Sequence, residues 1–231
     1  IALGAVVVAV VALIAGLAFS GAATPTLIAD PGPLVRWGLP LVQLLTDLSA
    51  TVTVGALAMC AVVLPRSRPA APARGETPDG AAWLLARGTA AVASVVWTVS
   101  LAVEIVLTYA QVAGRPIGGE TFGAELRVFL TQIELGQALV WALGLTATVS
   151  LGAVAVGGYA SAAWAAVGSL IAFVPIAATG HASGSANHML AVGSLWLHLV
   201  GVTIWIGGLA ILVAVAGALG RDLRVAAERF S

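Results

Sequence analysis

Six long apolar runs constrain the fold of this chain most strongly, because each is long enough to cross a lipid bilayer as a helix. A spanning helix needs about 20 predominantly apolar residues, since each residue adds about 1.5 Å along the helix axis. The runs do not alternate between polar and apolar residues, which argues against membrane-spanning strands. The predicted spans are Ile1–Ala23, Leu39–Leu64, Trp83–Ala113, Phe129–Val156, Tyr159–Thr179 and Leu190–Leu219.

The composition supports this interpretation. Of the 231 residues, 60% are hydrophobic and only 9% are charged, whereas soluble domains carry about 25% charged residues. A soluble core cannot absorb so much apolar surface. We therefore predict an all-α fold, a polytopic transmembrane helical bundle of about six spans that forms a single domain over residues 1–231. Cys60 is the only cysteine, which excludes an internal disulfide.

The basic residues are all arginines, and their distribution predicts the orientation of the chain. The loop at residues 65–82, the nearby Arg87 and the C-terminal tail together carry seven arginines, against three in the opposite loops. Cytoplasmic loops carry an excess of Lys and Arg, so we expect the 65–82 loop and both chain ends to be cytoplasmic. The loop at residues 180–190 then faces outside. Gly118–Phe129 is expected to form a short interfacial helix on the same outer side.

Three acidic residues, Asp47, Glu104 and Glu134, fall within the predicted spans. Charged groups in a bilayer are costly and rarely face lipid. Counted from the outer ends of their helices at about 1.5 Å per residue, these acids and His198 all lie about 8–14 Å deep. The shared depth predicts a polar cavity open to the outside, where Asp47, Glu104 and His198 face one another. Alternatively, the acids snorkel to the interface or pair only to hold the helices together.

All three histidines lie close together, in and after the expected outer loop. His181 and His188 flank the stretch ASGSAN, which allows both imidazoles to converge, whereas His198 lies deeper in the following span. Either all three bind one ion or His198 forms a second, deeper site, depending on where the helix starts. Met189 adds a thioether, and imidazole and thioether ligands favour copper over calcium or magnesium. The sequence therefore predicts His181, His188, His198 and Met189 as copper ligands.

Other roles for these side chains stay open. The histidines can handle protons or ligate a haem, although bis-histidine haem usually needs imidazoles from separate helices and these lie on one hairpin. Met59 and Cys60, near the cytoplasmic end of the second span, offer sulfur ligands for Cu(I) or simply pack in the core. No Ser–His–Asp arrangement, glycine-rich phosphate loop or zinc-protease motif can be placed in the sequence, so we expect no enzymatic activity.

The stretch WLHLVGVTIWIGGL places His198 one apolar turn before a Trp-Ile-Gly-Gly-Leu motif. With the upstream histidines, it resembles the CopD family of bacterial copper-resistance membrane proteins, including copper-uptake relatives of the YcnJ type. Arg36–Met59 is similar to the early helices of actinobacterial proteins in which a CopD part is fused to a CtaG-like oxidase-assembly part. The resemblance implies inward copper transport and places His181, His188 and His198 at the family's proposed ligand positions. It also implies that this chain is the N-terminal part of a longer protein.

Together these features predict a copper-binding, multi-pass protein of a bacterial cytoplasmic membrane that transports copper. The expected partners are copper, the lipid bilayer, and an extracytoplasmic copper chaperone or a cytochrome oxidase, and no nucleic acid is expected. One alternative is a copper-delivery or assembly factor for a respiratory cytochrome oxidase. Another is a proton- or haem-associated membrane subunit that binds no copper.

Overall fold

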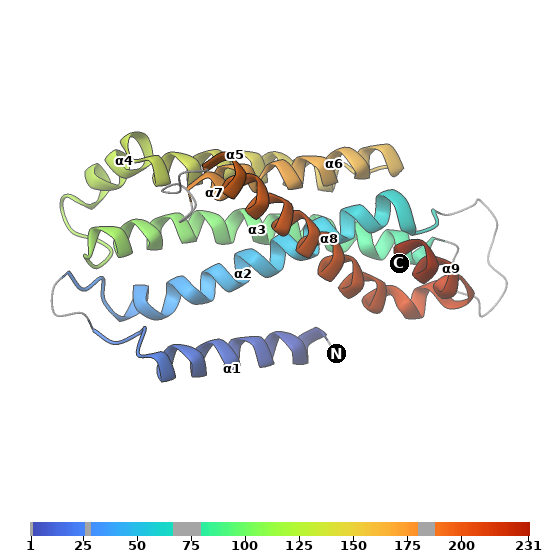
Figure 1. Cartoon of the computed structure of the whole chain (residues 1–231), viewed down its shortest axis with the longest axis horizontal. Coiled ribbons are helices and arrows are strands. Elements are labelled where there is room, and N and C mark those ends of the chain that lie inside the picture. Colours follow the sequence, from blue (N-terminus) through green and yellow to red (C-terminus); the bar gives the residue numbers. More distant parts are fainter. Residues whose placement is uncertain (1, 26–28, 67–79, 180–187) are drawn as a thin grey trace.

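The computed structural model describes residues 2–25, 29–66, 80–179 and 188–231, and every regular element within these ranges is a helix. Most of the long helices run side by side, and α8 crosses them obliquely (Figure 1). The predicted all-α helical bundle is therefore confirmed. The elements are α1 (Ala2–Ser20), α2 (Pro33–Ala58), the π-helix η1 (Met59–Val63), α3 (Ala81–Ala113), α4 (Phe122–Gln132), α5 (Glu134–Val154), α6 (Tyr159–Ile171), α7 (Val174–Thr179), α8 (His188–Leu219), the 3-10 helix η3 (Gly220–Asp222) and α9 (Leu223–Phe230).

Within the described residues, five segments are long and apolar enough to cross a membrane, and they correspond to five of the six predicted spans. The first predicted span forms α1, whose apolar part, Val7–Ser20, is shorter. Helix α1 lies along one edge of the bundle beside α2 (Figure 1), and most of its described side chains are exposed. The five longer segments are Pro33–Val63, Ala81–Ala113, Glu134–Val154, Tyr159–Ala178 and Met189–Phe230.

Large apolar side chains cover the outside of the bundle, and its interior holds many small residues as well as large ones. Trp164 is 76% exposed and Trp141 is 71% exposed, whereas Ala86, Ala90 and Ser94 are fully buried. Soluble proteins rarely expose wide apolar patches, and small residues at helix interfaces let the backbones of membrane helices approach closely. This distribution is that of a protein whose outer surface contacts lipid.

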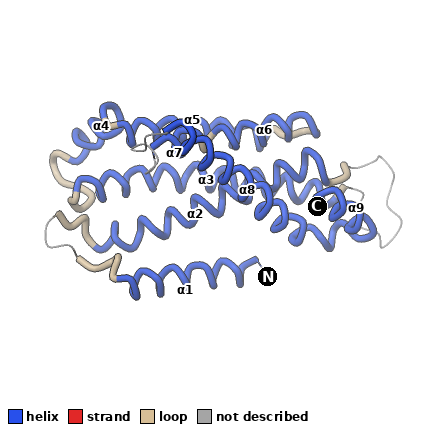
Figure 2. Tube along the Cα trace, in the orientation of Figure 1, coloured by secondary structure: helices blue, strands red, loops and turns tan. Residues whose placement is uncertain are grey.

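The traces of α2 and α8 cross (Figure 2), and two glycines, Gly55 and Gly207, meet between these helices. A Cβ atom on Gly55 would lie 2.1 Å from the carbonyl carbon of Gly207, and one on Gly207 would lie 2.2 Å from the carbonyl oxygen of Thr51. Neither glycine has room for a side chain, so the two backbones touch. Gly208 similarly leaves room for the ring of Phe230 on α9. The two glycines of the Trp-Ile-Gly-Gly-Leu motif therefore shape the packing of α8 against α2 and α9.

The fourth span begins later than predicted. It was expected to start at Phe129, but α4 continues to Gln132 and α5 starts only at Glu134, with Ile133 extended between the two helices. The chain folds back tightly here, since a Cβ atom on Gly136 would lie 2.0 Å from the carbonyl oxygen of Phe129. The predicted start of this span was therefore wrong by five residues, whereas the short helix predicted before it is present as α4.

The fifth span is interrupted between α6 and α7. Pro175 lies in the first turn of α7, and proline has no N–H to continue the hydrogen bonding of a preceding helix. The indole of Trp196 on α8 donates a hydrogen bond from Nε1 to the carbonyl oxygen of Leu170, 3.0 Å away. A side chain from α8 thus satisfies a carbonyl group at the end of α6 and ties the two helices together.

Candidate functional site

Two of the predicted acids come together between α2 and α3. Gln43 and Asp47 lie one turn apart on α2, and Glu104 lies on α3. The Glu104 carboxyl lies close enough to Thr46, Gln43 and Asp47 for all three to act on its charge. We call Gln43, Thr46, Asp47, Ser100 and Glu104 the acidic cluster. The structure therefore brings Asp47 and Glu104, from two different spans, into one polar group.

Two hydroxyl groups form the buried side of the acidic cluster. Thr46 Oγ1 and Ser100 Oγ lie 3.1 Å apart, and both side chains are buried. Ser100 precedes Glu104 by four residues and so shares its face of α3. The sequence analysis missed Thr46 and Ser100. The available signal was a hydroxyl residue next to Asp47 and another one turn before Glu104.

The acidic cluster is open on its other side, where Gln43 and Asp47 are exposed and Glu104 is half-buried. Two neighbouring carboxylates repel each other, and the repulsion grows in apolar surroundings. A bound cation or a proton shared by the pair relieves that repulsion. The cluster therefore offers carboxylate, amide and hydroxyl oxygens to a cation, and two carboxyl groups that can exchange protons.

Glu134 lies at the start of a helix, not inside a span. It is the first residue of α5 and is exposed. An acidic side chain in the first turn of a helix interacts favourably with the helix dipole. The sequence predicted a span that starts at Phe129, with Glu134 about five residues inside it. Because the span begins at Glu134 itself, this carboxylate lies at the end of the span.

His198 lies on the outward face of α8, where it is exposed. Gly207 follows it by nine residues, and nine steps of about 100° make about two and a half turns, which leaves the two residues half a turn apart around the helix axis. Gly207 packs against α2, so His198 is on the opposite face of α8. The structure thus places Asp47 with Glu104 but directs His198 away from the helix that carries Asp47.

The remaining copper ligands predicted from the sequence lie at the start of α8 and before it. His181 lies outside the described residues, and so does the side chain of His188, although His188 begins α8. Ten residues of helix separate His188 from His198, which is about 15 Å of axial rise. The two residues therefore lie at different depths along α8. Met189 is 82% exposed. Among the described residues, no three His, Cys, Asp or Glu side chains gather as a metal site.

Met59 and Cys60, the other predicted sulfur ligands, lie in the core at the π-helical end of α2. Both are buried, and the Cys60 thiol faces the carbonyl oxygen of Trp83 at 3.7 Å. The indole Nε1 of Trp83 donates in return to the carbonyl oxygen of Cys60 at 3.0 Å. This reciprocal pair joins the end of α2 to the start of α3 and gives Cys60 a packing role.

Two ion pairs tie down the loops at the end of the bundle opposite α9. Asp30 forms a salt bridge with Arg36, and the guanidinium of Arg36 and the N–H of Gly32 lower the pKa of Asp30. Glu125 accepts a hydrogen bond from Tyr109 at 2.8 Å and pairs with Arg115 at 3.2 Å.

The contacts of Glu125 also change the pKa of its carboxyl group. The Tyr109 hydrogen bond, a second one from Thr121 and the Arg115 charge lower the pKa of Glu125. The sequence analysis did not identify this group, because its members come from α3, α4 and the loop between them.

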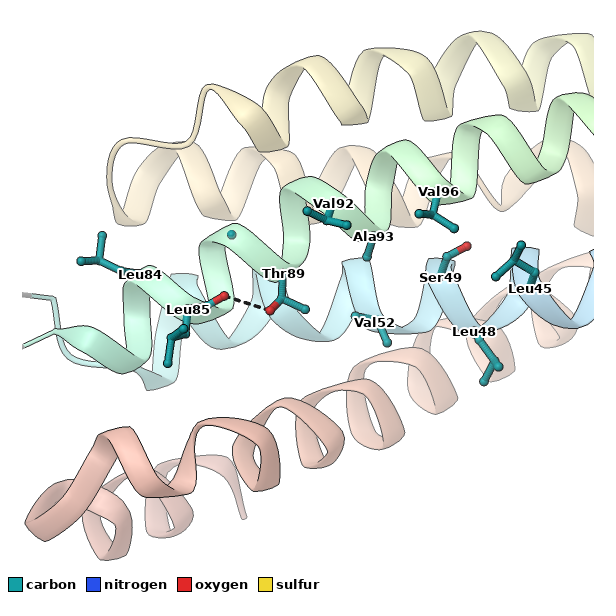
Figure 3. A pocket seen from close by; sticks show the side chains of 11 residues that line it. Leu45, Leu48, Ser49, Val52, Leu84, Leu85, Thr89, Val92, Ala93 and Val96 are labelled. Carbon is teal, nitrogen blue, oxygen red and sulfur yellow. Dashed lines mark hydrogen bonds between the residues drawn. The ribbon is translucent and has the colours of Figure 1, made fainter. Parts of the chain in front are cut away.

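An apolar groove of about 680 Å³ runs between α2 and α3 (Figure 3). Leucine and valine side chains dominate its walls, among them Leu48, Val52 and Val92. The hydroxyl of Thr89 donates to the carbonyl oxygen of Leu85 within α3 at 2.9 Å. None of the described residues that line the groove is charged, so this lining suits hydrocarbon chains better than a metal ion.

Comparison with known proteins identifies the family. A protein-family model described as "Copper resistance protein D-like, N-terminal domain" matches residues 29–190, which include α2 to α7 and both Asp47 and Glu104. The match ends at the start of α8, before the Trp-Ile-Gly-Gly-Leu motif on which the resemblance was chiefly based. No curated protein and no solved structure matches the chain. The matched segment covers more than half of the sequence, and the chain therefore belongs to the family of copper resistance protein D-like membrane proteins.

Proposed function

We propose that this protein binds copper outside a bacterial cytoplasmic membrane and moves it inward past the acidic cluster. The observation that supports this most strongly is the pairing of Asp47 and Glu104 between adjacent spans of a copper-resistance family member. Intramembrane ionisable groups are costly and typically mark ion or proton pathways. Family membership makes copper the cation of interest, and the carboxyl pair supplies negative charge in its path.

Copper is the cargo of this pathway. In the proposal, His181, His188 and Met189 capture the ion at the outer surface, because imidazole and thioether are ligands that copper favours. His198, about 15 Å further along α8, forms a separate second station. Asp47 and Glu104 are harder ligands that suit Cu(I) poorly. Their role is to offset the charge of the passing cation or to carry protons whose movement is coupled to that of copper, and no catalytic step is required.

A second candidate function, copper delivery to a membrane partner such as a cytochrome oxidase, is favoured by the outward position of His198. An imidazole on the exposed face of α8 is accessible to another protein in the bilayer. It points away from α2, which carries part of the acidic cluster. In this function the chain hands copper over sideways and does not transport it. A proton- or haem-associated subunit without copper is the remaining alternative.

Copper uptake into proteoliposomes, followed with an internal copper indicator, tests transport. Wild-type vesicles are expected to accumulate copper, and Asp47→Asn/Glu104→Gln to reduce the rate about tenfold or more, which is about 1.4 kcal/mol. The matched control is Glu120→Gln/Glu134→Gln, which removes two exposed carboxylates and is expected to leave the rate within about twofold of wild type.

Metal analysis of the purified protein separates the alternatives. The His181→Ala/His188→Ala variant is expected to lose bound copper, whereas the acidic variant retains it. Copper bound by the wild type without any uptake contradicts transport and supports delivery. Absence of copper together with a haem Soret band contradicts both copper functions.

A further inference from the structure

Two arginines converge on the turn between α5 and α6, at the end of the bundle where α9 lies. The guanidinium of Arg66 stacks over the ring of Trp83, with its central carbon 5.4 Å from the ring centroid. Its backbone N–H donates to the Tyr159 hydroxyl at 2.7 Å. Arg87 follows Trp83 by four residues, hence on the same face of α3, and donates to the carbonyl oxygen of Val154 at 3.4 Å. Both guanidinium groups are therefore fixed near residues 154–159.

The charges of Arg66 and Arg87 are not neutralised by the described part of the chain. Their partners are an aromatic ring and a carbonyl oxygen, and neither forms a salt bridge with a described acidic residue. The carboxylate of Glu228 on α9 is paired with Arg224 at 2.8 Å. Two oriented guanidinium groups that both lie near residues 154–159 and have no carboxylate partner among the described residues can together receive an anion with several oxygen acceptors.

The position of the pair identifies which anion fits. Arg66 lies just after the span Pro33–Val63, and Arg87 lies in the second turn of the span Ala81–Ala113, so both are at the level of the lipid headgroups. Directly toward the membrane interior, Leu151 is 75% exposed and Val154 is 56% exposed on α5. A ligand held here meets cationic groups at the interface and apolar side chains below them.

We propose that Arg66 and Arg87 bind the phosphate of an anionic phospholipid, whose acyl chains lie against Leu151 and Val154. The phosphodiester accepts charge-assisted hydrogen bonds from both guanidinium groups, which Trp83 and the Val154 carbonyl hold in place. A basic residue near a membrane surface contributes about 1 kcal/mol to binding an anionic lipid, which corresponds to roughly fivefold in affinity for each arginine. This site is separate from the copper pathway and does not depend on it.

The test measures phosphatidylglycerol bound to the whole purified chain in detergent, by native mass spectrometry, against phosphatidylcholine. We expect preferential retention of phosphatidylglycerol, lowered about 20-fold in Arg66→Gln/Arg87→Gln and partly restored in Arg66→Lys/Arg87→Lys. The matched control, Arg221→Gln/Arg224→Gln, removes two charges from the same end of the bundle and is expected to change retention less than twofold. Unchanged thermal melting in phosphatidylcholine shows that each variant is folded.

Three outcomes would overturn the proposal. Equal retention of phosphatidylcholine would mean that the anionic headgroup is not recognised. An equal loss in the Arg221→Gln/Arg224→Gln control would mean that diffuse positive charge, and not the oriented pair, attracts the lipid. Displacement of the lipid by inorganic phosphate at equimolar concentration would assign the pair to free phosphate.

Discussion

The α2–α3 pair and the outer half of α8 contain polar groups at similar predicted depth, but these groups differ in whether they meet other polar side chains. Asp47 and Glu104 have partners: they interact with each other and with Thr46 and Gln43. His198 is exposed on the face of α8 opposite the one that packs on α2. Equal depth therefore does not imply a shared site, because the rotation of each helix about its own axis decides which side chains meet.

The difference has a packing cause. α2 and α3 meet through buried hydroxyl and small side chains, such as Thr46 and Ser100, and this close fit fixes the rotation of both helices. The rotation of α8 is set elsewhere, by the contact of Gly207 with α2 and the hydrogen bond of Trp196 to α6. Both contacts direct the opposite side of α8 outward, and His198 lies on it.

The largest effect is expected from breaking the contact that sets this rotation. Gly207→Leu forces a side chain into the backbone of α2, and we expect it to lower the free energy of unfolding by about 3 kcal/mol or more. The measurement is unfolding in mixed detergent micelles. Gly201→Leu is the control on the same helix, since a Cβ there meets no atom within 4 Å. Equal destabilisation by both variants would contradict the close crossing.

An intermediate effect sharpens the contrast between the two regions. Thr46→Val removes a buried hydroxyl that donates to the carbonyl oxygen of Val42 and contacts Ser100, and we expect a loss of about 1–2 kcal/mol in the free energy of unfolding. His198→Ala removes an exposed side chain and is expected to change it by less than about 0.5 kcal/mol. The same unfolding assay checks both. A large loss in His198→Ala would show that His198 packs against protein.

The smallest effect concerns pH and the outer loops. The folded pKa of Glu125 is lowered by Tyr109, Thr121 and Arg115, so its stabilisation is present above the unfolded value of about 4.3 and is lost as the pH falls through the folded value. Wild type should therefore melt at a higher temperature than Glu125→Gln near neutral pH, with the gap closing in acid. Glu120→Gln, which removes another exposed carboxylate, serves as the control for a general loss of one charge. A Glu125→Gln gap that persists below the folded pKa would contradict this assignment.

Much of the fold could be predicted from the apolar runs, because a bilayer imposes a minimum helix length that the sequence must meet. The similar depth of Asp47 and Glu104 also followed from counting residues inward from the helix ends. The break at Ile133 did not, since it depends on the contact between Gly136 and the carbonyl of Phe129, a tertiary feature within an apolar run. The interruption before α7 had a signal in Pro175 that the sequence analysis did not use.

The outward position of His198 could not be predicted for a different reason. Helix α8 is apolar on all sides, so it has no amphipathic stripe from which to deduce its inward face. The Gly207–Gly208 pair was the usable sign of a close crossing, but only the structure identifies Gly55 as its counterpart. Whether His181, His188 and Met189 hold copper stays a prediction.

The crossing at Gly55 and Gly207 has a mechanical consequence. Helices that touch through bare backbone meet at a fulcrum and not along a seam of interlocked side chains. A rigid helix that tilts about a fulcrum moves its two arms in opposite directions. One arm of α8 carries His198, and the other leads to α9, where Arg229 contacts the Val63 carbonyl at the end of η1. A tilt that moves the His198 end of α8 in one direction would thus move the α9 end in the opposite direction.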